Sequence, residues 1–240
     1  METGLKGKTV LITGAGRRLG RLAALMFAKE GANVAICTSR IMKELNQVAD
    51  EVRALGAGCI AEQCDVTDAA SVAVFVKSAH AKFGSVDVAI NNAGYRAEGR
   101  FLEERFDEWQ KTLAVNLTGP YHVCRNVIPL MLEKRWGRII NLSGVAPYLG
   151  GGATKAAVKL GIVGFTRGLA REFAKQGITA NCIGPGHISK DPDNMDAPNH
   201  PMGRKGKPIE AVSMMVHLAS ENAAYINGQC YLINGGMYFQ

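Results

Sequence analysis

Seven short apolar runs alternate along the chain with longer segments whose apolar residues recur every three or four positions. The short runs are apolar on both alternating sets of positions, which is typical of parallel strands covered on both faces. They predict strands at 9–13, 33–38, 58–63, 86–90, 138–142, 179–183 and 229–233. The longer segments predict helices at 21–30, 42–55, 69–83, 104–132 (two helices), 155–176 and 209–220.

Residues with special backbone roles mark several of these boundaries. Gly31 and Gly56 directly follow the first two predicted helices, where glycine commonly ends a helix. Either Thr67 or Asp68 can cap the third helix at its N-terminus. Because strand–helix units repeat without a linker or low-complexity tract, we expect one doubly wound α/β domain over residues 1–240 with a mostly parallel seven-stranded sheet.

Composition narrows the class of protein. The chain is 47% hydrophobic and 20% charged, as globular proteins are, and its 28 glycines gather in loops between apolar runs. No run of about 20 apolar residues and no secretory leader pattern is present, so we expect neither a membrane helix nor export. The six cysteines and five histidines lack metal-ligand spacing, so we predict reduced thiols, no metal and a cytoplasmic protein.

The net charge of +7 raises the question of a nucleic-acid partner. Binding to nucleic acid needs a clustered basic face, but the basic residues here do not form one long run. Several lie instead near a glycine-rich loop: Arg17, Arg18, Arg21 and Arg40. A nucleotide phosphate is the more economical partner, so we expect no nucleic-acid binding.

The glycine-rich loop has the context that phosphate binding requires. The first predicted strand runs directly into Thr13-Gly14-Ala15-Gly16-Arg17-Arg18-Leu19-Gly20, and a helix follows. Glycines allow a sharp turn and let a pyrophosphate approach the helix N-terminus, where backbone amides and the helix dipole favour anions. The strand before the loop and the helix after it favour a dinucleotide site over an ordinary tight turn.

Further motifs together resemble the short-chain dehydrogenase/reductase family over nearly the whole chain. After the loop come Asp65-Val66, Asn91-Asn92-Ala93-Gly94, Asn116 within Val115–Gly119, Asn141-Leu142-Ser143, Thr154-Lys155-Ala156-Ala157, Asn181–Gly186 and Asn234-Gly235-Gly236. The resemblance implies a Rossmann fold, a nicotinamide cofactor and a homodimer or homotetramer. One departure lies in the loop, where the family's usual glycine or alanine is replaced by Arg18, as in pteridine-reductase-like members.

The resemblance also implies which residues bind the cofactor. Where NAD-preferring folds carry an acid after the second strand, this chain has Ser39 and Arg40. A hydroxyl and a guanidinium would bind a 2′-phosphate that a carboxylate would repel, so we predict NADP(H), with Arg17 as a second basic residue. The cofactor-binding residues expected are Gly14, Arg17, Arg18, Leu19, Gly20, Ser39, Arg40, Asp65, Val66, Asn92, Ala93, Gly94, Lys155, Pro185, Gly186 and Ile188.

The catalytic residues implied by the family fit only in part. A family tyrosine protonates the carbonyl oxygen, with a lysine four residues later, a serine and an asparagine beside it. Asn116, Ser143 and Lys155 are the candidates here. Gly151, however, stands four residues before Lys155, the family serine aligns best with Gly144, and the segment from Gly144 to Lys155 is several residues short.

Three interpretations of the missing tyrosine stay open. The printed sequence lacks a stretch around Gly150–Ala153; the deletion is real and leaves a silent dinucleotide-binding protein; or Tyr148 is the acid. Three glycines between Tyr148 and Lys155 disfavour the last. We predict an NADPH-dependent carbonyl reductase acting on a small ketone or ketoacyl substrate, and the alternative is a catalytically silent NADP(H)-binding protein that acts through oligomer contacts.

Overall fold

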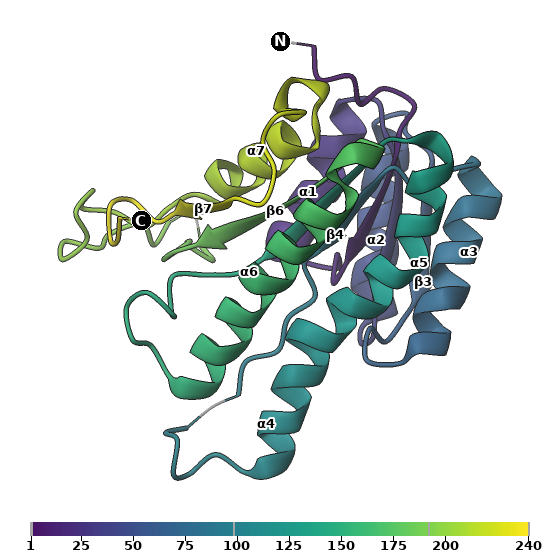
Figure 1. Cartoon of the computed structure of the whole chain (residues 1–240). Coiled ribbons are helices and arrows are strands. Elements are labelled where there is room, and N and C mark those ends of the chain that lie inside the picture. The colour runs from purple at the N-terminus through teal and green to yellow at the C-terminus, as the bar shows by residue number, and fades with distance from the viewer. Residues whose placement is uncertain (1, 98, 192, 240) are drawn as a thin grey trace.

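The computed structural model describes residues 2–97, 99–191 and 193–239, and in it one sheet lies between two layers of helices (Figure 1). All strand pairings described are parallel, in the order β3-β2-β1-β4-β5-β6-β7. The strands are β1 (Thr9–Thr13), β2 (Asn33–Thr38), β3 (Cys59–Gln63), β4 (Val88–Asn91), β5 (Gly137–Leu142), β6 (Ile178–Pro185) and β7 (Cys230–Ile233). The doubly wound α/β fold is therefore confirmed, with a sheet that is wholly parallel in the described part.

Two helical layers bury the two faces of this sheet. One layer contains α1 (Arg18–Lys29), α2 (Met42–Ala54) and α7 (Pro208–Ala219), whose apolar residues share a core with β1 and β2. The other contains α3 (Ala69–Phe83), α5 (Gly119–Lys134) and α6 (Ala153–Phe173). The middle of β1 is apolar on both faces because each face meets a helix, and all five residues of β1, including its two terminal threonines, are buried.

The predicted boundaries agree closely with the observed ones. Gly31 and Gly56 follow α1 and α2 with φ of 78° and 83°, the left-handed conformation that glycine adopts at low cost. Asp68 caps α3 by accepting a hydrogen bond of 2.9 Å from the Ala70 amide. All six cysteines are buried and free.

The predicted helical segment 104–132 contains a feature that periodicity did not reveal. It divides into α4 (Phe106–Leu113) and α5, joined by a π-helical turn at Ala114–Thr118. Such turns widen a helix by one residue and often lie at functional sites. This one carries Asn116.

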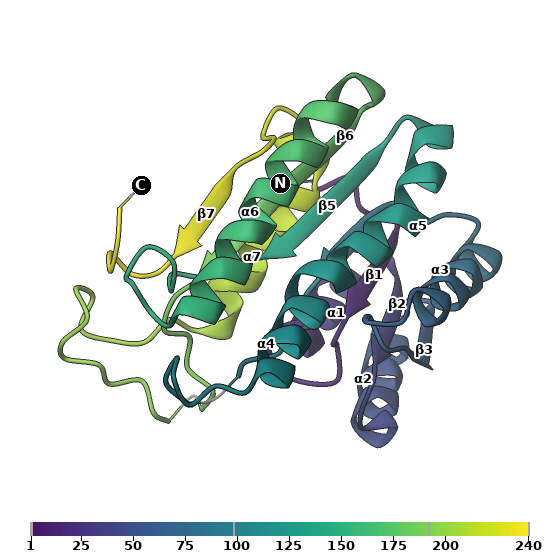
Figure 2. The same cartoon turned by 60° about the horizontal axis from the view of Figure 1, so that its bottom comes forward.

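The carboxyl ends of the strands form the edge at which the long loops gather. Figure 2 shows the segment before α4 and the segment before α7 on the side to which β5 and β7 point. Within the described residues, no helix is both long and apolar enough to span a bilayer.

Candidate functional site

A cavity opens where the strand order reverses. From β1 the chain winds outward to β2 and β3, then returns to β4 on the other side of β1, so the loops after β1 and β4 diverge. Open α/β sheets bind ligands in such crevices. The cavity here measures about 700 Å³, and most of the predicted cofactor residues line it: Gly14, Arg17, Arg18, Leu19, Ser39, Arg40, Asp65, Val66, Asn92, Ala93 and Gly94.

The glycine-rich loop is fixed against the end of β4. The side-chain amide of Asn92 donates hydrogen bonds of 2.9 Å to the carbonyl oxygens of Thr13 and Gly14, and the Ala93 amide donates to Thr13 Oγ1 at 3.0 Å. A Cβ at Gly14 would lie 2.9 Å from the Ala93 Cα, and Gly14 has a φ of 64°. Only glycine fits this close approach, which leaves the loop backbone open to a ligand.

The N-terminus of α1 faces the same cavity with unpaired positive charge. No acidic residue stands in its first turn, and none of the described ion pairs includes Arg17, Arg18 or Arg40. Helix amides and guanidinium groups are the donors that a pyrophosphate needs. The residues present therefore fit a phosphate-bearing dinucleotide. One carboxylate that the sequence analysis did not consider, Glu44 of α2, also lines this cavity.

A second cavity, of about 850 Å³, continues from the first. Arg18, Gly94 and Tyr95 line both. The second cavity is walled by the loop after β4, the π-turn, the end of β5 and the first turns of α6. The two spaces together would hold a dinucleotide and a small substrate side by side.

Asn116 lies in the wall of the second cavity and is almost fully buried. Its amide nitrogen donates hydrogen bonds to the carbonyl oxygens of Tyr95 at 2.7 Å and Thr112 at 2.9 Å. Thr112 lies four residues before Asn116, so the second bond joins the π-turn to the last residues of α4. The loop after β4 is thereby held on α4.

Ser143 also lines this cavity, but its hydroxyl is already in use. Its Oγ donates a hydrogen bond of 2.8 Å to the main-chain oxygen of Lys159. A serine that orients a carbonyl must donate to it, so Ser143 would have to release this bond. Gly144, the next residue, has no side chain to offer.

Two lysines, not one, enter the cavity from α6. The predicted Lys155 is in the first turn and partly exposed, and Lys159 follows one helical turn further in. The Lys159 ammonium donates to the Leu142 oxygen at 2.9 Å, and burial lowers its pKa to about 8. Burial, and then the charge of Arg96, lower the pKa of Lys155. Lys159 was not among the residues predicted from the sequence, although its spacing of four from Lys155 is readable there.

Tyr148 lies apart from these groups. Its ring stacks on Tyr238 with centroids 5.1 Å apart, and its hydroxyl lies 3.8 Å from Cys230 Sγ. Burial raises its pKa to about 12, which makes it a weak proton donor. It is not among the described residues lining the second cavity.

The remaining predicted residues occupy supporting positions. Pro185 lines the second cavity, whereas Gly20, Gly186 and Ile188 are not among the described lining residues of either cavity. A Cβ at Gly20 would lie 2.6 Å from Asn92 Nδ2, and one at Gly186 would lie 2.8 Å from the Asn234 Cα, so both glycines allow close packing. Ile188 forms an isolated bridge with Gly206.

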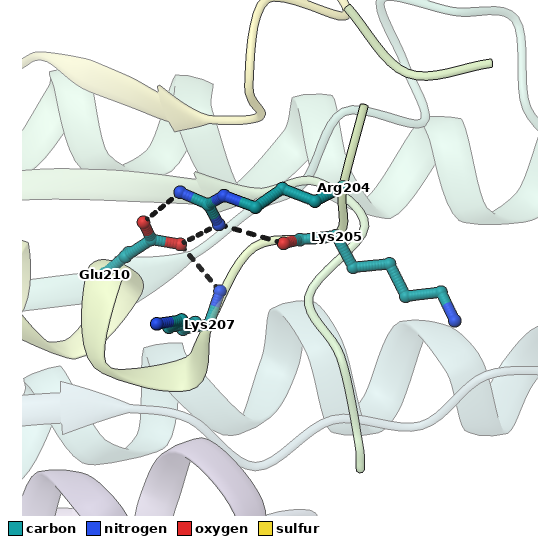
Figure 3. A network of polar contacts seen from close by, with 4 residues as sticks. All are labelled: Arg204, Lys205, Lys207 and Glu210. Carbon is teal, nitrogen blue, oxygen red and sulfur yellow. Dashed lines mark hydrogen bonds and ion pairs between the residues drawn. The ribbon is translucent and has the colours of Figure 1, made fainter. Parts of the chain in front are cut away.

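The segment between β6 and α7 is anchored by an ionic network at its far end. Arg204 binds Glu210 through both carboxylate oxygens, at 2.7 and 3.0 Å, and Glu210 also accepts from the Lys207 amide at 2.6 Å (Figure 3). Arg204 holds the pKa of Glu210 near 2. Closer to the site, His187 Nδ1 lies 2.9 Å from His200 Nε2, so these rings bridge the two arms of the segment.

Comparison with known proteins gives a consistent result. A family profile described as "Enoyl-(Acyl carrier protein) reductase" matches residues 14–238. The chain is 36% identical to a 3-oxoacyl-(acyl-carrier-protein) reductase FabG from Staphylococcus aureus (strain Mu50), over 96% of this chain and 98% of that protein. It is 37% identical to the FabG of Vibrio harveyi and 36% identical to a 3-oxoacyl-(acyl-carrier-protein) reductase of Synechocystis, each over 98% of both chains.

Proposed function

The chain belongs to the short-chain dehydrogenase/reductase family, a family of oxidoreductases acting on CH–OH and C=O groups, and from this premise we propose that it is an NADPH-dependent ketone or ketoacyl reductase in which Lys155 donates the proton. The observation that carries this proposal is the lysine pair on α6. Both side chains line the cavity that adjoins the dinucleotide groove. A bound dihydronicotinamide would supply the hydride to the carbonyl carbon.

Lysine is a reasonable acid in place of a phenol. The unperturbed pKa values of tyrosine and lysine are similar, about 10 and 10.4. Because burial and Arg96 lower the pKa of Lys155, its ammonium gives up a proton more readily than an ordinary lysine. The ammonium would protonate the carbonyl oxygen as the hydride arrives, and the resulting amine would regain its proton from water at the cavity mouth.

Lys159 then takes the role first given to Lys155. With Lys159 as the family lysine, Lys155 stands four residues before it, at the place of the tyrosine, and Ser143 twelve before that. This spacing is close to the family pattern, so no omitted stretch is needed around residues 150–153. The spacing also supports Asn116 and Lys159 as the residues that position the proton donor and the cofactor ribose.

Two arginines support NADP(H) over NAD(H). Arg17 and Arg40 line the cavity at the ends of β1 and β2, and no described carboxylate forms an ion pair with either of them. A 2′-phosphate would meet these guanidinium groups and Ser39. The Glu44 carboxylate lines the same cavity and would repel a 2′-phosphate. The preference for NADP(H) over NAD(H) is therefore tested with an Arg40→Ala variant.

The decisive experiment follows NADPH oxidation with a panel of ketones and 3-oxoacyl N-acetylcysteamine thioesters. Lys155→Met removes the acid, so we expect kcat to fall about 100-fold or more, with the Kd for NADPH changed less than about threefold. Lys155→Tyr restores a phenol and should keep at least the wild-type kcat, with a different pH profile. Lys175→Met, an exposed lysine beyond α6, is the matched control and should behave as wild type.

Two outcomes would contradict the proposal. Unchanged turnover in Lys155→Met would exclude this residue as the proton donor. Tight NADPH binding without turnover of any carbonyl would favour the silent dinucleotide-binding protein instead. We also propose that the chain is one domain and assembles as a homodimer or homotetramer. Size-exclusion chromatography with light scattering, run on the same preparations, tests the assembly. Fractionation of the native host tests the proposed cytoplasmic location.

A further inference from the structure

The second cavity has an unusually cationic wall. Five basic side chains line it, from three separate segments of the chain, and one carboxylate, Glu104, is found among the described lining residues. The basic residues are Arg18 at the start of α1, Arg96 and Arg100 in the loop after β4, and Lys155 and Lys159 on α6. Reduction of a neutral ketone by the proposed mechanism uses Lys155 and Lys159 and needs none of the three arginines.

The charges are not compensated by the part of the protein that is described. The ion pairs there join Arg21 with Glu51, Arg53 with Asp50, Arg105 with Asp107, and Arg204 with Glu210, and include none of the five. Glu104 accepts a hydrogen bond from Thr154 Oγ1, and its other oxygen is enclosed without a described partner. Among the described lining residues, positive charges therefore outnumber negative ones.

The cations are also close enough to oppose one another. The charge of Arg96 disfavours protonated Lys155, and the charge of Lys155 disfavours protonated Lys159. Arg18, Arg96 and Arg100 are exposed and the two lysines are half-buried, and like charges gathered around one cavity repel one another until an anion joins them. The electrostatics therefore point to a negatively charged ligand at the cavity end where Arg96 and Lys155 lie.

Arg18 adds an independent observation from the backbone. Its φ of 51° lies in the left-handed region, which costs a non-glycine residue about 1 kcal/mol. Glycine would avoid this cost at the same position. Since Arg18 lines both cavities, its guanidinium stands at the junction of the dinucleotide groove and the substrate space, where a strained residue is commonly functional.

We propose that the second cavity selects carbonyl substrates that carry an anionic oxygen group near the reacting carbonyl, held by Arg96 and Arg18. The shared chemistry is that of a carboxylate or a phosphate, both of which guanidinium groups bind through paired hydrogen bonds. This inference rests on the proposed function, because it names the substrate class of that same site. It assigns Arg96 and Arg18 to substrate selection.

The first test compares kcat/KM for three ketones with NADPH: 3-oxobutanoate, its neutral methyl ester and hydroxyacetone phosphate. We expect the wild type to prefer the carboxylate or the phosphate over the neutral ester by at least tenfold. Arg96→Gln should reduce that preference at least tenfold, mainly through KM. Arg171→Gln removes the same charge from the far end of α6 and should leave the preference unchanged.

The carboxylate and the phosphate substrates distinguish the two sources of negative charge. A preference confined to 3-oxobutanoate identifies a carboxylate. A preference confined to hydroxyacetone phosphate identifies a phosphate. Equal kcat/KM for all three ketones, with no effect of Arg96→Gln on their ratios, would overturn the inference and leave the proposed reductase function intact.

A second test does not depend on turnover. Calorimetric titration of 3-oxobutanoate and its methyl ester into the protein saturated with NADP⁺ measures binding when no hydride can be transferred. We expect the acid to bind at least tenfold more tightly than the ester, and Arg18→Gly or Arg96→Gln to remove most of the difference. If this held while NADPH oxidation failed with every carbonyl, the proposed function would be wrong and the anion site would stand. If acid and ester bound equally, the anion site would be refuted.

Discussion

At the scale of single residues, Lys159 carries the largest electrostatic cost in the site. Its ammonium has one described hydrogen bond, to the Leu142 oxygen, and is otherwise enclosed near the positive charge of Lys155. A buried lysine with a pKa of about 8 is easily neutralised, and its amine is then a good hydrogen-bond acceptor. The cost falls at the place where the proposed mechanism moves a proton.

The cost can be measured as stability. The pKa of Lys159 is about 8 in the fold against 10.5 for an ordinary lysine, so the unfolded chain binds more protons between these values. The destabilisation caused by burying the Lys159 ammonium is complete below pH 8, shrinks as the pH rises from 8 to 10.5, and is absent above pH 10.5. We expect Lys159→Met to raise the free energy of unfolding by about 2 kcal/mol at pH 7, after allowing about 1 for the lost hydrogen bond.

Urea unfolding of the cofactor-free protein at pH 7, 8, 9 and 10 measures this difference. The stability advantage of Lys159→Met should fall steadily from pH 8 upward. An advantage that stayed constant over the whole range would mean that Lys159 is not the titrating group.

Arg40 offers a second prediction at this scale. It is exposed at the rim of the dinucleotide cavity, beside Ser39, and its role in the proposal is to bind a 2′-phosphate. Loss of a charge-assisted hydrogen bond costs about 1.5 to 3 kcal/mol. We therefore expect Arg40→Ala to weaken NADPH binding about 10- to 100-fold and NADH binding less than about twofold.

Fluorescence titration of both cofactors measures the effect. Arg125→Ala, an exposed arginine on α5, serves as the control for the loss of one positive charge. Equal weakening of NADPH and NADH by Arg40→Ala would show that Arg40 does not recognise the 2′-phosphate, and preserved NADPH preference would assign that role to Arg17.

At the scale of elements, glycines of α6 and of the turn after it have opposite roles. Gly168 lies exposed within α6, and a Cβ there would meet nothing within 4 Å. Gly177, in the turn that leads into β6, has a φ of 80°, and a Cβ there would lie 2.2 Å from the Arg135 oxygen. The same chemical change should therefore stabilise one site and destabilise the other.

We expect Gly168→Ala to raise the free energy of unfolding by about 0.5 to 1 kcal/mol through helix propensity. Gly177→Ala should lower it by more than about 2 kcal/mol, because both the backbone angle and the Arg135 carbonyl oppose the methyl group. Thermal and urea unfolding of the two variants provide the comparison. A destabilised Gly168→Ala would indicate that this face of α6 is covered by another molecule.

At the scale of the whole molecule, the dinucleotide groove and the hydrophobic core share the same central strands. The groove is built at the ends of β1, β2 and β4. β1 and β4 are buried throughout, and β2 is buried except at its two terminal residues. Because the groove exists only in the folded protein, a ligand that binds it stabilises the fold against unfolding. NADPH at 100 times its Kd should raise the free energy of unfolding by about 2.7 kcal/mol.

This corresponds to a rise in Tm of roughly 5 to 10 °C for a chain of this size. Differential scanning fluorimetry with and without NADPH measures it. Lys155→Met should keep the full shift, because that side chain lies in the second cavity. Gly14→Val should lose it, because the added side chain would meet Ala93 and close the approach to the loop. A shift that survived Gly14→Val would place the cofactor elsewhere.

The sequence by itself determined the layers and most of the dinucleotide groove. Strands apolar on both faces can be stable only under helices, and glycines at the first turn mark a close backbone approach, so both were readable locally. The roles of the two lysines of α6 were readable only in part. Their spacing of four is in the sequence, but the burial of Lys159 against the end of β5, which lowers its pKa, was decided by the tertiary structure.

The cationic cavity was likewise decided only by tertiary structure. Arg18, Arg96, Arg100 and the two lysines are widely spaced along the chain, and each alone resembles a solvated surface charge. Charge interactions depend on distance in space and on exclusion of water, neither of which a linear sequence contains. The fold brings these residues to one edge of the sheet and thereby creates the property from which the substrate class is inferred.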